Sequence, residues 1–274
     1  FIDFFKAIID YWKVIKKSYI NFMAINKQST TARSSASEAI IDQGLRAHML
    51  NVYNYMAAGV LLTGFVALFC FKMAAITSAE GQIIGLTNFG NAILNSGLKW
   101  VIMLSPLAIV IYMTFGAAKI STSRAQTLFW IFCILMGASL TSLFVIFTGL
   151  SITRVFFITA GTFGAMSIYG YTTKRDLTKL GSFCMMGLFG IIIASLVNIF
   201  TKSPMTYYVI SYIGVLVFIG LTAYDTQKIK NMYLMSEGNS SALLNKQAIY
   251  GALTLYLDFI NLFIFLLRIF GQRR

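Results

Sequence analysis

Seven long apolar runs constrain this chain more than any other feature of its sequence. A membrane-spanning helix needs about 20 predominantly apolar residues, and each run comes close to that length with few charges. Strands of a membrane barrel would instead alternate apolar and polar residues over about ten positions, and segments such as LFGIIIASLVNIF do not alternate. The sequence therefore predicts an all-α membrane protein, a bundle of seven transmembrane helices. The expected spans are residues 49–71, 100–118, 127–148, 152–172, 182–201, 205–227 and 248–270.

Charged residues are too few to coat a water-soluble globule. Of the 274 residues, 58% are hydrophobic and 11% are charged, whereas soluble domains carry about 25% charged residues. This composition argues against a soluble enzyme and against a disordered chain, which would need low hydrophobicity. The formal net charge of +13 comes from short basic clusters between the apolar runs, a pattern typical of cytoplasmic loops. We expect the lipid bilayer, and no nucleic acid, as a partner.

The distribution of Lys and Arg predicts the orientation. With the N-terminus in the cytoplasm, the inner connections hold eight basic residues against four outside, and the segment before the first span adds seven more inside. The positive-inside rule favours this arrangement. It places Arg268, Arg273 and Arg274 outside, which opposes the rule. Either these three are tolerated, or the last span does not fully cross.

The segment before the first span divides into two expected parts. In residues 1–23 the apolar side chains, among them Phe5, Trp12 and Tyr19, recur on one helical face, and the lysines lie off it. This pattern predicts an amphipathic helix lying on the membrane surface. Residues 24–46, which include KQSTTARSSAS, are expected to form a flexible cytoplasmic linker. The seven-helix domain would then cover residues 47–274.

The sequence offers little material for catalysis. His48 is the only histidine, so neither a Ser-His-Asp triad nor a zinc protease site can be assembled. No Gly-rich phosphate loop or nucleotide fingerprint appears. The three cysteines lie inside apolar runs, and their number and spacing suit neither a disulfide framework nor a metal site. We therefore expect no enzyme and no cofactor.

Two aspartates inside spans form the candidate functional site. Asp225 stands near the cytoplasmic end of the sixth span and Asp258 well inside the seventh. An ionised aspartate at mid-membrane costs about 2.5–3.5 kcal/mol, so such residues face a protein interior or a water-filled path. The connection between these spans is short, which favours antiparallel neighbours and would allow the carboxyls to meet. Two close carboxylates cannot both ionise cheaply, so the pair would share a proton and titrate in two steps.

A supporting polar face is expected beside the pair. Thr254 and Asn261 lie on the same side of the last helix as Asp258, and Tyr224 precedes Asp225. A purely structural interpretation stays open at this point. In that interpretation Asp225 is a solvated helix-end residue near Lys228, and Asp258 is an acid hydrogen-bonded within the bundle.

Four segments resemble the Bax inhibitor-1 family in its bacterial branch, one of the groups of transmembrane Bax-inhibitor-motif proteins. They are QGLRAHMLNVYNYMAAG, IYGYTTKRDLTKLGSF, FIGLTAYDTQKIK and LTLYLDFINLFIFLLRIFG. The resemblance covers about residues 40–274 and implies a seven-helix bundle with the last helix surrounded by the other six. It also implies a pH-sensitive calcium leak, a link to stress and cell-death regulation and, in one bacterial branch, restraint of a membrane-anchored protease.

The resemblance implies roles for the two aspartates as well. In the calcium-conducting members an aspartate pair on the last two spans is the pH sensor, and those positions match Asp225 and Asp258. Calcium would be the permeating ion rather than a cofactor, with the two carboxylates as a transient contact. The sequence departs from the family in one respect. Some members place a charge on the second span to engage the pair, and residues 100–118 contain no Lys, Arg, Asp or Glu.

Three functions are consistent with the sequence and its family resemblance. The first is a calcium-permeable leak gated by protonation of Asp225 and Asp258, because carboxylates suit a hard cation. The second is a regulatory protein that binds and restrains a membrane protease or another membrane partner. The third, an intramembrane aspartyl protease, finds support in Tyr224 and Asp225, but the residues before Asp258 lack the glycine that such sites need. The bacterial resemblance favours the plasma (inner) membrane.

Overall fold

The computed structural model describes residues 35–78, 82–117, 119–236 and 240–274. Within these residues, seven helices are long and apolar enough to cross a membrane, which confirms the predicted all-α class and number of spans. The helix predicted for residues 1–23, and residues 24–34 of the predicted linker, lie outside the described residues. The seven helices are α2 (Ser35–Ala74), α4 (Leu98–Phe115), α5 (Thr122–Ile146), α6 (Gly149–Thr172), α7 (Thr178–Thr201), α8 (Pro204–Met235) and α9 (Ser241–Phe270).

Polar capping residues decide where several of these helices begin. The side chains of Ser121, Thr148 and Ser203 accept hydrogen bonds from the first-turn amides of α5, α6 and α8, respectively. Such caps satisfy amides that have no partner within the helix, and Pro204 at the start of α8 suits a position that needs no amide. Most helices therefore begin a few residues before the apolar runs that predicted them.

The second half of the predicted linker differs from expectation. Residues 35–46 are not a flexible segment but the first turns of α2, a helix of 40 residues. The segment contains two Ala and one each of Glu, Gln, Leu and Arg, which favour helix, and no proline interrupts it. The helix of the first span therefore continues well beyond the apolar run.

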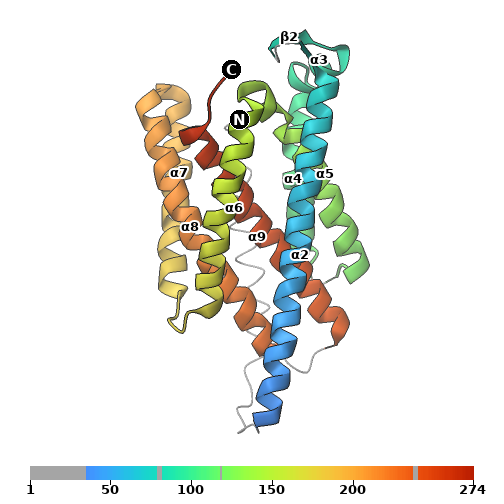
Figure 1. Cartoon of the computed structure of the whole chain (residues 1–274), viewed down its shortest axis with the longest axis vertical. Helices are drawn as coiled ribbons and strands as arrows, with labels where there is room; N and C mark the ends of the chain where they lie inside the picture. The colour runs from blue at the N-terminus through green and yellow to red at the C-terminus, as the bar shows by residue number, and fades with distance from the viewer. Residues whose placement is uncertain (1–34, 79–81, 118, 237–239) are drawn as a thin grey trace.

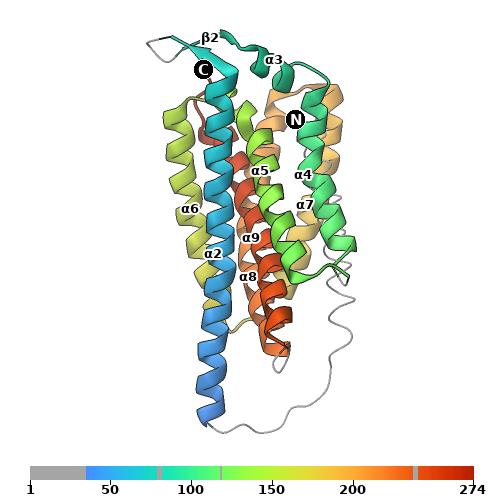
Figure 2. The same cartoon turned by 90° about the vertical axis from the view of Figure 1, so that its right-hand side faces the viewer.

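A small structured connection joins α2 to α4, where no strand was predicted. It consists of the antiparallel strands β1 (Ala75–Thr77) and β2 (Ile83–Leu86), followed by α3 (Asn88–Leu94). Figure 2 shows these elements above the helices, at one end of the bundle. The Thr87 hydroxyl ties the connection to α2, donating to the Met73 carbonyl oxygen over 2.7 Å.

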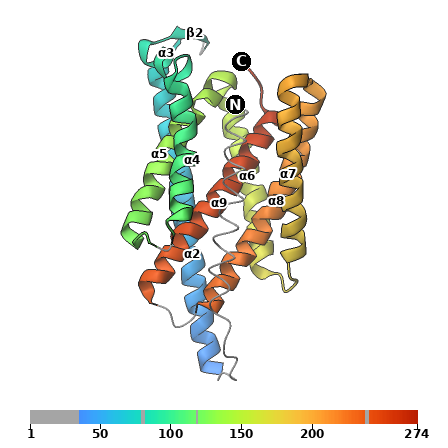
Figure 3. The same cartoon turned by 180° about the vertical axis from the view of Figure 1, so that it is seen from behind.

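Helix α9 runs through the centre of the bundle, with the other six around it (Figures 1 and 3). In its most apolar stretch 78% of the residues are buried, against 22% in α7. This confirms the predicted central position of the last helix. Aromatic side chains fill the interface around it; the Tyr256 ring, for example, meets Phe132 edge to face with centroids 5.2 Å apart.

The two ends of the described chain lie at opposite ends of the bundle (Figure 1). We call these the Ser35 end, where α2 and α9 begin, and the Arg274 end. At the Arg274 end the chain after α9 pairs with the α5–α6 connection: the Arg274 amide donates to the Ile146 carbonyl over 2.9 Å, and the Thr148 amide donates to Gln272 over 3.0 Å. Helix α9 therefore runs from one end to the other, and the alternative of an incomplete last crossing finds no support.

Candidate functional site

The structure brings Asp225 of α8 and Asp258 of α9 together inside the bundle. Asp225 is 1% exposed and Asp258 is fully buried, and the two carboxyl groups lie close enough to each other for a hydrogen bond. All four carboxylate oxygens are inaccessible to solvent. An ionised carboxylate only accepts hydrogen bonds, so this contact requires a proton on one of the two groups. Asp225 is thus not the solvated helix-end residue of the structural interpretation, because α8 continues beyond it to Met235.

Lys228 supplies positive charge near the pair. It follows Asp225 by one helical turn, and its charge acts on Asp258. Its Nζ atom lies 5.8 Å from the centroid of the Tyr224 ring. Residues 100–118 contain no charged residue, and the positive charge that acts on Asp258 comes from Lys228 of α8.

Small residues bring α7 close to this part of α8. A Cβ atom at Gly181 would lie 2.5 Å from the Tyr224 ring, so only glycine fits there. Gly220 of α8 leaves room in the same way for the Cys184 sulfur. Cys184 is buried and near enough to feel the charges of both aspartates. One wall of the site is therefore a thiol and an aromatic ring packed against glycines.

Helix α6 forms a second wall and adds hydroxyl groups. The hydroxyls of Ser167 and Thr226 are hydrogen-bonded over 3.1 Å, and both residues are buried. Gly170 packs directly on the backbone of Ala223, with no space for a side chain. Sequence reasoning missed both contacts, although Thr226 directly follows Asp225 in the AYDTQ motif that carries the family resemblance.

The glutamine of the same motif fixes the loop between α6 and α7. The Gln227 Oε1 atom accepts from the Leu177 amide over 2.8 Å, and its Nε2 atom donates to the Arg175 carbonyl over 2.7 Å. Lys230 adds a bond of 2.8 Å from its Nζ atom to the Tyr171 carbonyl. This loop is therefore attached to α8 directly beyond Asp225, toward the Ser35 end.

The residues of the expected supporting polar face, Thr254, Asn261 and Tyr224, contact their own helices and α7. The Thr254 hydroxyl donates to the Tyr250 carbonyl, and the Asn261 Nδ2 atom donates to the Leu257 carbonyl, so both bond to their own helix. The Asn261 Oδ1 atom is buried and has no hydrogen-bond partner within the described residues. Tyr224 packs against Gly181, and Lys228 lies near its ring.

The carboxyl pair does not form a resident metal site. Across the described ranges, no cluster of three or more His, Cys, Asp or Glu side chains could hold a metal ion. Calcium takes six to eight oxygen ligands when it is held in a protein site. Two carboxyl groups alone provide fewer oxygen ligands than such a site uses.

Apolar packing closes the way from the pair to the Arg274 end. Phe259 meets Phe156 and Phe163 edge to face, each with centroids 5.6 Å apart. Farther along α9, residues 262–267 are all apolar and buried. Along this stretch the side chains of α9 therefore offer no polar group to water or an ion.

Comparison with known proteins places these features in a family context. The family model described as "Inhibitor of apoptosis-promoting Bax1" matches residues 45–274. The inner membrane protein YbhL of Escherichia coli is 45% identical over 244 residues, which cover 88% of this chain and 99% of YbhL. The uncharacterized protein RP147 of Rickettsia prowazekii is 47% identical over 244 residues, covering 89% and 97% of the two chains. An uncharacterized protein of Borreliella burgdorferi is 43% identical over 227 residues, which cover 82% of this chain and 92% of that protein.

Proposed function

Because the chain belongs to the Bax inhibitor-1 family, we propose that it is a pH-sensitive calcium leak of the bacterial inner membrane, gated by Asp225 and Asp258. The buried contact between these two carboxyls carries the proposal. Acids inside spans are costly and rare, so a buried contact between two of them marks a candidate functional site. The inner membrane is inferred from the name of the YbhL relative.

Gating follows from the charge state of the pair. With one shared proton the carboxyls hold α8 and α9 together, and the apolar packing toward the Arg274 end remains closed. Loss of that proton leaves two negative charges in contact, which repel strongly at low dielectric. Repulsion separates the two helices, and the exposed carboxylates attract a hard cation such as calcium. Flow is downhill, with calcium as the permeating ion.

Calcium entry into liposomes tests the proposal. The purified full chain is reconstituted with a calcium indicator inside the vesicles, and entry is recorded between pH 5.5 and pH 8. We expect entry only with protein present, falling as the pH is lowered. Entry that rises on acidification would contradict the direction of gating, and no entry at any pH would contradict the leak itself.

A second function is supported by the outer face of α7. This helix is the least buried of the seven, and Phe183, Met186 and Ile193 are more than 60% exposed on it. Such a face suits contact with another membrane protein as well as with lipid. Under this alternative, the chain binds and restrains a membrane-anchored protease or another membrane partner, in stress or cell-death regulation. Vesicles that hold the chain alone would then show no calcium entry.

The proposed orientation, with the N-terminus in the cytoplasm, predicts a labelling pattern. In a variant without Cys70, Cys133 and Cys184, a membrane-impermeant thiol reagent applied from outside should modify a cysteine added after Arg274. It should miss a cysteine that replaces Ser35, because the two ends lie on opposite sides of the bundle. Modification at position 35 alone would invert the orientation. Protection of both positions would contradict seven full crossings.

A further inference from the structure

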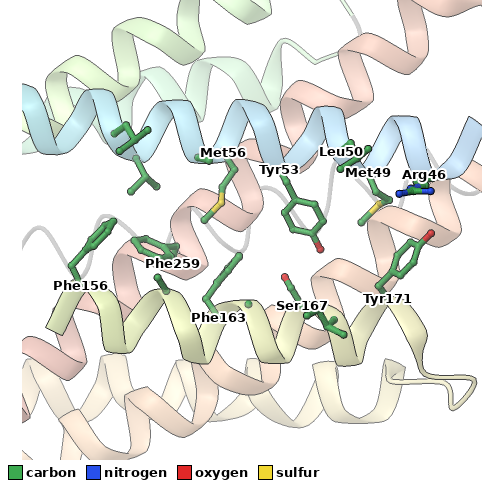
Figure 4. Close-up of a pocket in the computed structure, with 16 residues that line it drawn as sticks. Arg46, Met49, Leu50, Tyr53, Met56, Phe156, Phe163, Ser167, Tyr171 and Phe259 are labelled. Atoms are coloured by element: carbon green, nitrogen blue, oxygen red, sulfur yellow. The ribbon is translucent and has the colours of Figure 1, made fainter. Parts of the chain in front are cut away.

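A long cavity opens between α2 and α6 on the side of the bundle. It has a volume of about 660 Å³, within the range typical of small-molecule sites. Residues 46–61 of α2 and 156–171 of α6 form its two sides, and Phe259 of α9 stands at its back. Figure 4 shows Tyr53 and Met56 pointing from α2 toward Phe163 and Ser167 of α6. Neither Asp225 nor Asp258 lines the cavity, although Phe259 is adjacent in sequence to Asp258 and Ser167 belongs to the α6 wall of the carboxyl site.

The polarity of the cavity changes along its length. The side chains with polar groups are Arg46, Tyr53, Ser167 and Tyr171, and all four lie in the half toward the Ser35 end (Figure 4). The other half is lined by Met, Ala, Val, Leu and Phe. An occupant that matches this lining has one charged or polar end and a long apolar remainder.

The charge at the polar end favours an anion. Arg46 is exposed and is the one charged side chain among the described residues that line the cavity. Lys230 lies beside this end, with its Nζ atom 5.2 Å from the centroid of the Tyr171 ring. Asp42, one turn before Arg46, is the acid that also acts on Tyr171. Two cations against one acid leave the polar end with a positive charge.

The length of the cavity matches a lipid tail. Residues 46–61 extend over about 22 Å at 1.5 Å per helical residue, and one leaflet of the hydrocarbon core is about 15 Å thick. The cavity thus accommodates an acyl chain together with part of its headgroup. In the proposed orientation, its positive end lies at the cytoplasmic leaflet, where the headgroups are.

We propose that this cavity is a specific site for an anionic phospholipid of the cytoplasmic leaflet. The acyl chain lies between α2 and α6 against Phe163 and Phe259, and the phosphate is held at Arg46. This inference does not depend on calcium conduction, because it rests only on the shape, polarity and charge of the cavity.

The chain offers two pairs of matched variants for the test. Gly164 lines the cavity and Gly161 does not, and a Cβ at either position would meet no atom within 4 Å. Gly164→Leu therefore fills the cavity, while Gly161→Leu adds the same side chain elsewhere on α6. Ala57→Leu, inside the cavity, and Ala58→Leu, outside it, form the corresponding pair on α2. The second pair keeps the test valid if one variant fails to fold.

Binding is measured on the purified full chain by native mass spectrometry, with phosphatidylglycerol as the anionic probe and phosphatidylcholine as the neutral one. We expect one retained phosphatidylglycerol on the unaltered protein and on Gly161→Leu and Ala58→Leu. Affinity should fall about tenfold in Gly164→Leu and Ala57→Leu, which corresponds to the displacement of about two chain methylenes. Arg46→Gln should remove the preference for the anionic probe, whereas Arg124→Gln, an exposed arginine of α5, should not.

Three results would overturn the proposal. Equal retention in all four leucine variants would show that the bound lipid lies elsewhere. Equal loss in cavity and control variants would indicate only a non-specific lipid shell. Loss of a dimer or of a co-purifying membrane protein in the cavity variants, with lipid retention unchanged, would identify a protein helix as the occupant.

Discussion

Replacing either aspartate of the buried pair with asparagine is expected to flatten the pH dependence of calcium entry. Asparagine keeps the shape of the side chain and its capacity for hydrogen bonds, but it cannot lose a proton. The like-charge repulsion between Asp225 and Asp258 then no longer develops as the pH rises. In liposomes, we expect the rate of calcium entry to change by less than about twofold between pH 6 and pH 8. Over that range the ratio of charged to neutral form of a titrating group changes about tenfold per pH unit. Alanine at either position also removes the contact and should leave the protein leaky at low pH.

Asp176→Asn is the matched control for this experiment. Asp176 lies in the α6–α7 loop, where its carboxylate accepts hydrogen bonds from the hydroxyl and the amide of Thr178. These bonds lower its pKa below the ordinary value, so it is ionised throughout the range from pH 6 to pH 8. Its replacement should leave the pH profile unchanged. An Asp225→Asn protein that keeps the profile of the unaltered chain would end the gating proposal.

Adding one methyl group at Gly170 is expected to destabilise the protein strongly. The Cβ of Gly170→Ala would overlap the carbonyl oxygen of Ala223, and a backbone atom cannot rotate away as a side chain can. Helices α6 and α8 would have to separate, weakening the bond between Ser167 and Thr226 next to the carboxyl pair. Overpacking of this kind costs about 1–3 kcal/mol or more. The thermal unfolding midpoint of the purified protein in detergent measures the effect.

Gly161→Ala provides the comparison on the same helix. Gly161 is exposed, and a Cβ there would meet no atom within 4 Å. Alanine also favours helix over glycine, so the unfolding midpoint should stay the same or rise. Equal midpoints for Gly170→Ala and Gly161→Ala would contradict the close approach of α6 and α8.

The seven helices were predictable because each apolar run is long enough to cross a bilayer, and no core packing has to be known to recognise one. The ranking of the helices by burial was not predictable in this way. Helix α7 is the most apolar of the seven and the least buried, while α9 is the most buried. Lipid tails are as apolar as a protein interior, so apolar character alone does not separate a lipid-facing helix from a central one. The central position of α9 was expected from the family resemblance instead.

The meeting of Asp225 and Asp258 was expected because a short connection makes α8 and α9 antiparallel neighbours. The surroundings of the pair depended on contacts between distant parts of the chain. Gln227 bonds to Arg175 and Leu177 across α8 and the α6–α7 loop, and nothing near Gln227 in the sequence indicates that loop. The β1–β2 hairpin was missed for another reason, since its strands have only three and four residues and show no clear alternation.

The central position of α9 has a consequence for how the protein is made. The chain is synthesised from its N-terminus, so the six surrounding spans leave the ribosome before the helix that they enclose. Asp225 is then already in the bilayer when Asp258 arrives, and the proton shared between them offsets the cost of about 2.5–3.5 kcal/mol for an ionised aspartate at mid-membrane. A chain interrupted before Ser241 would insert six helices with no central helix to pack against.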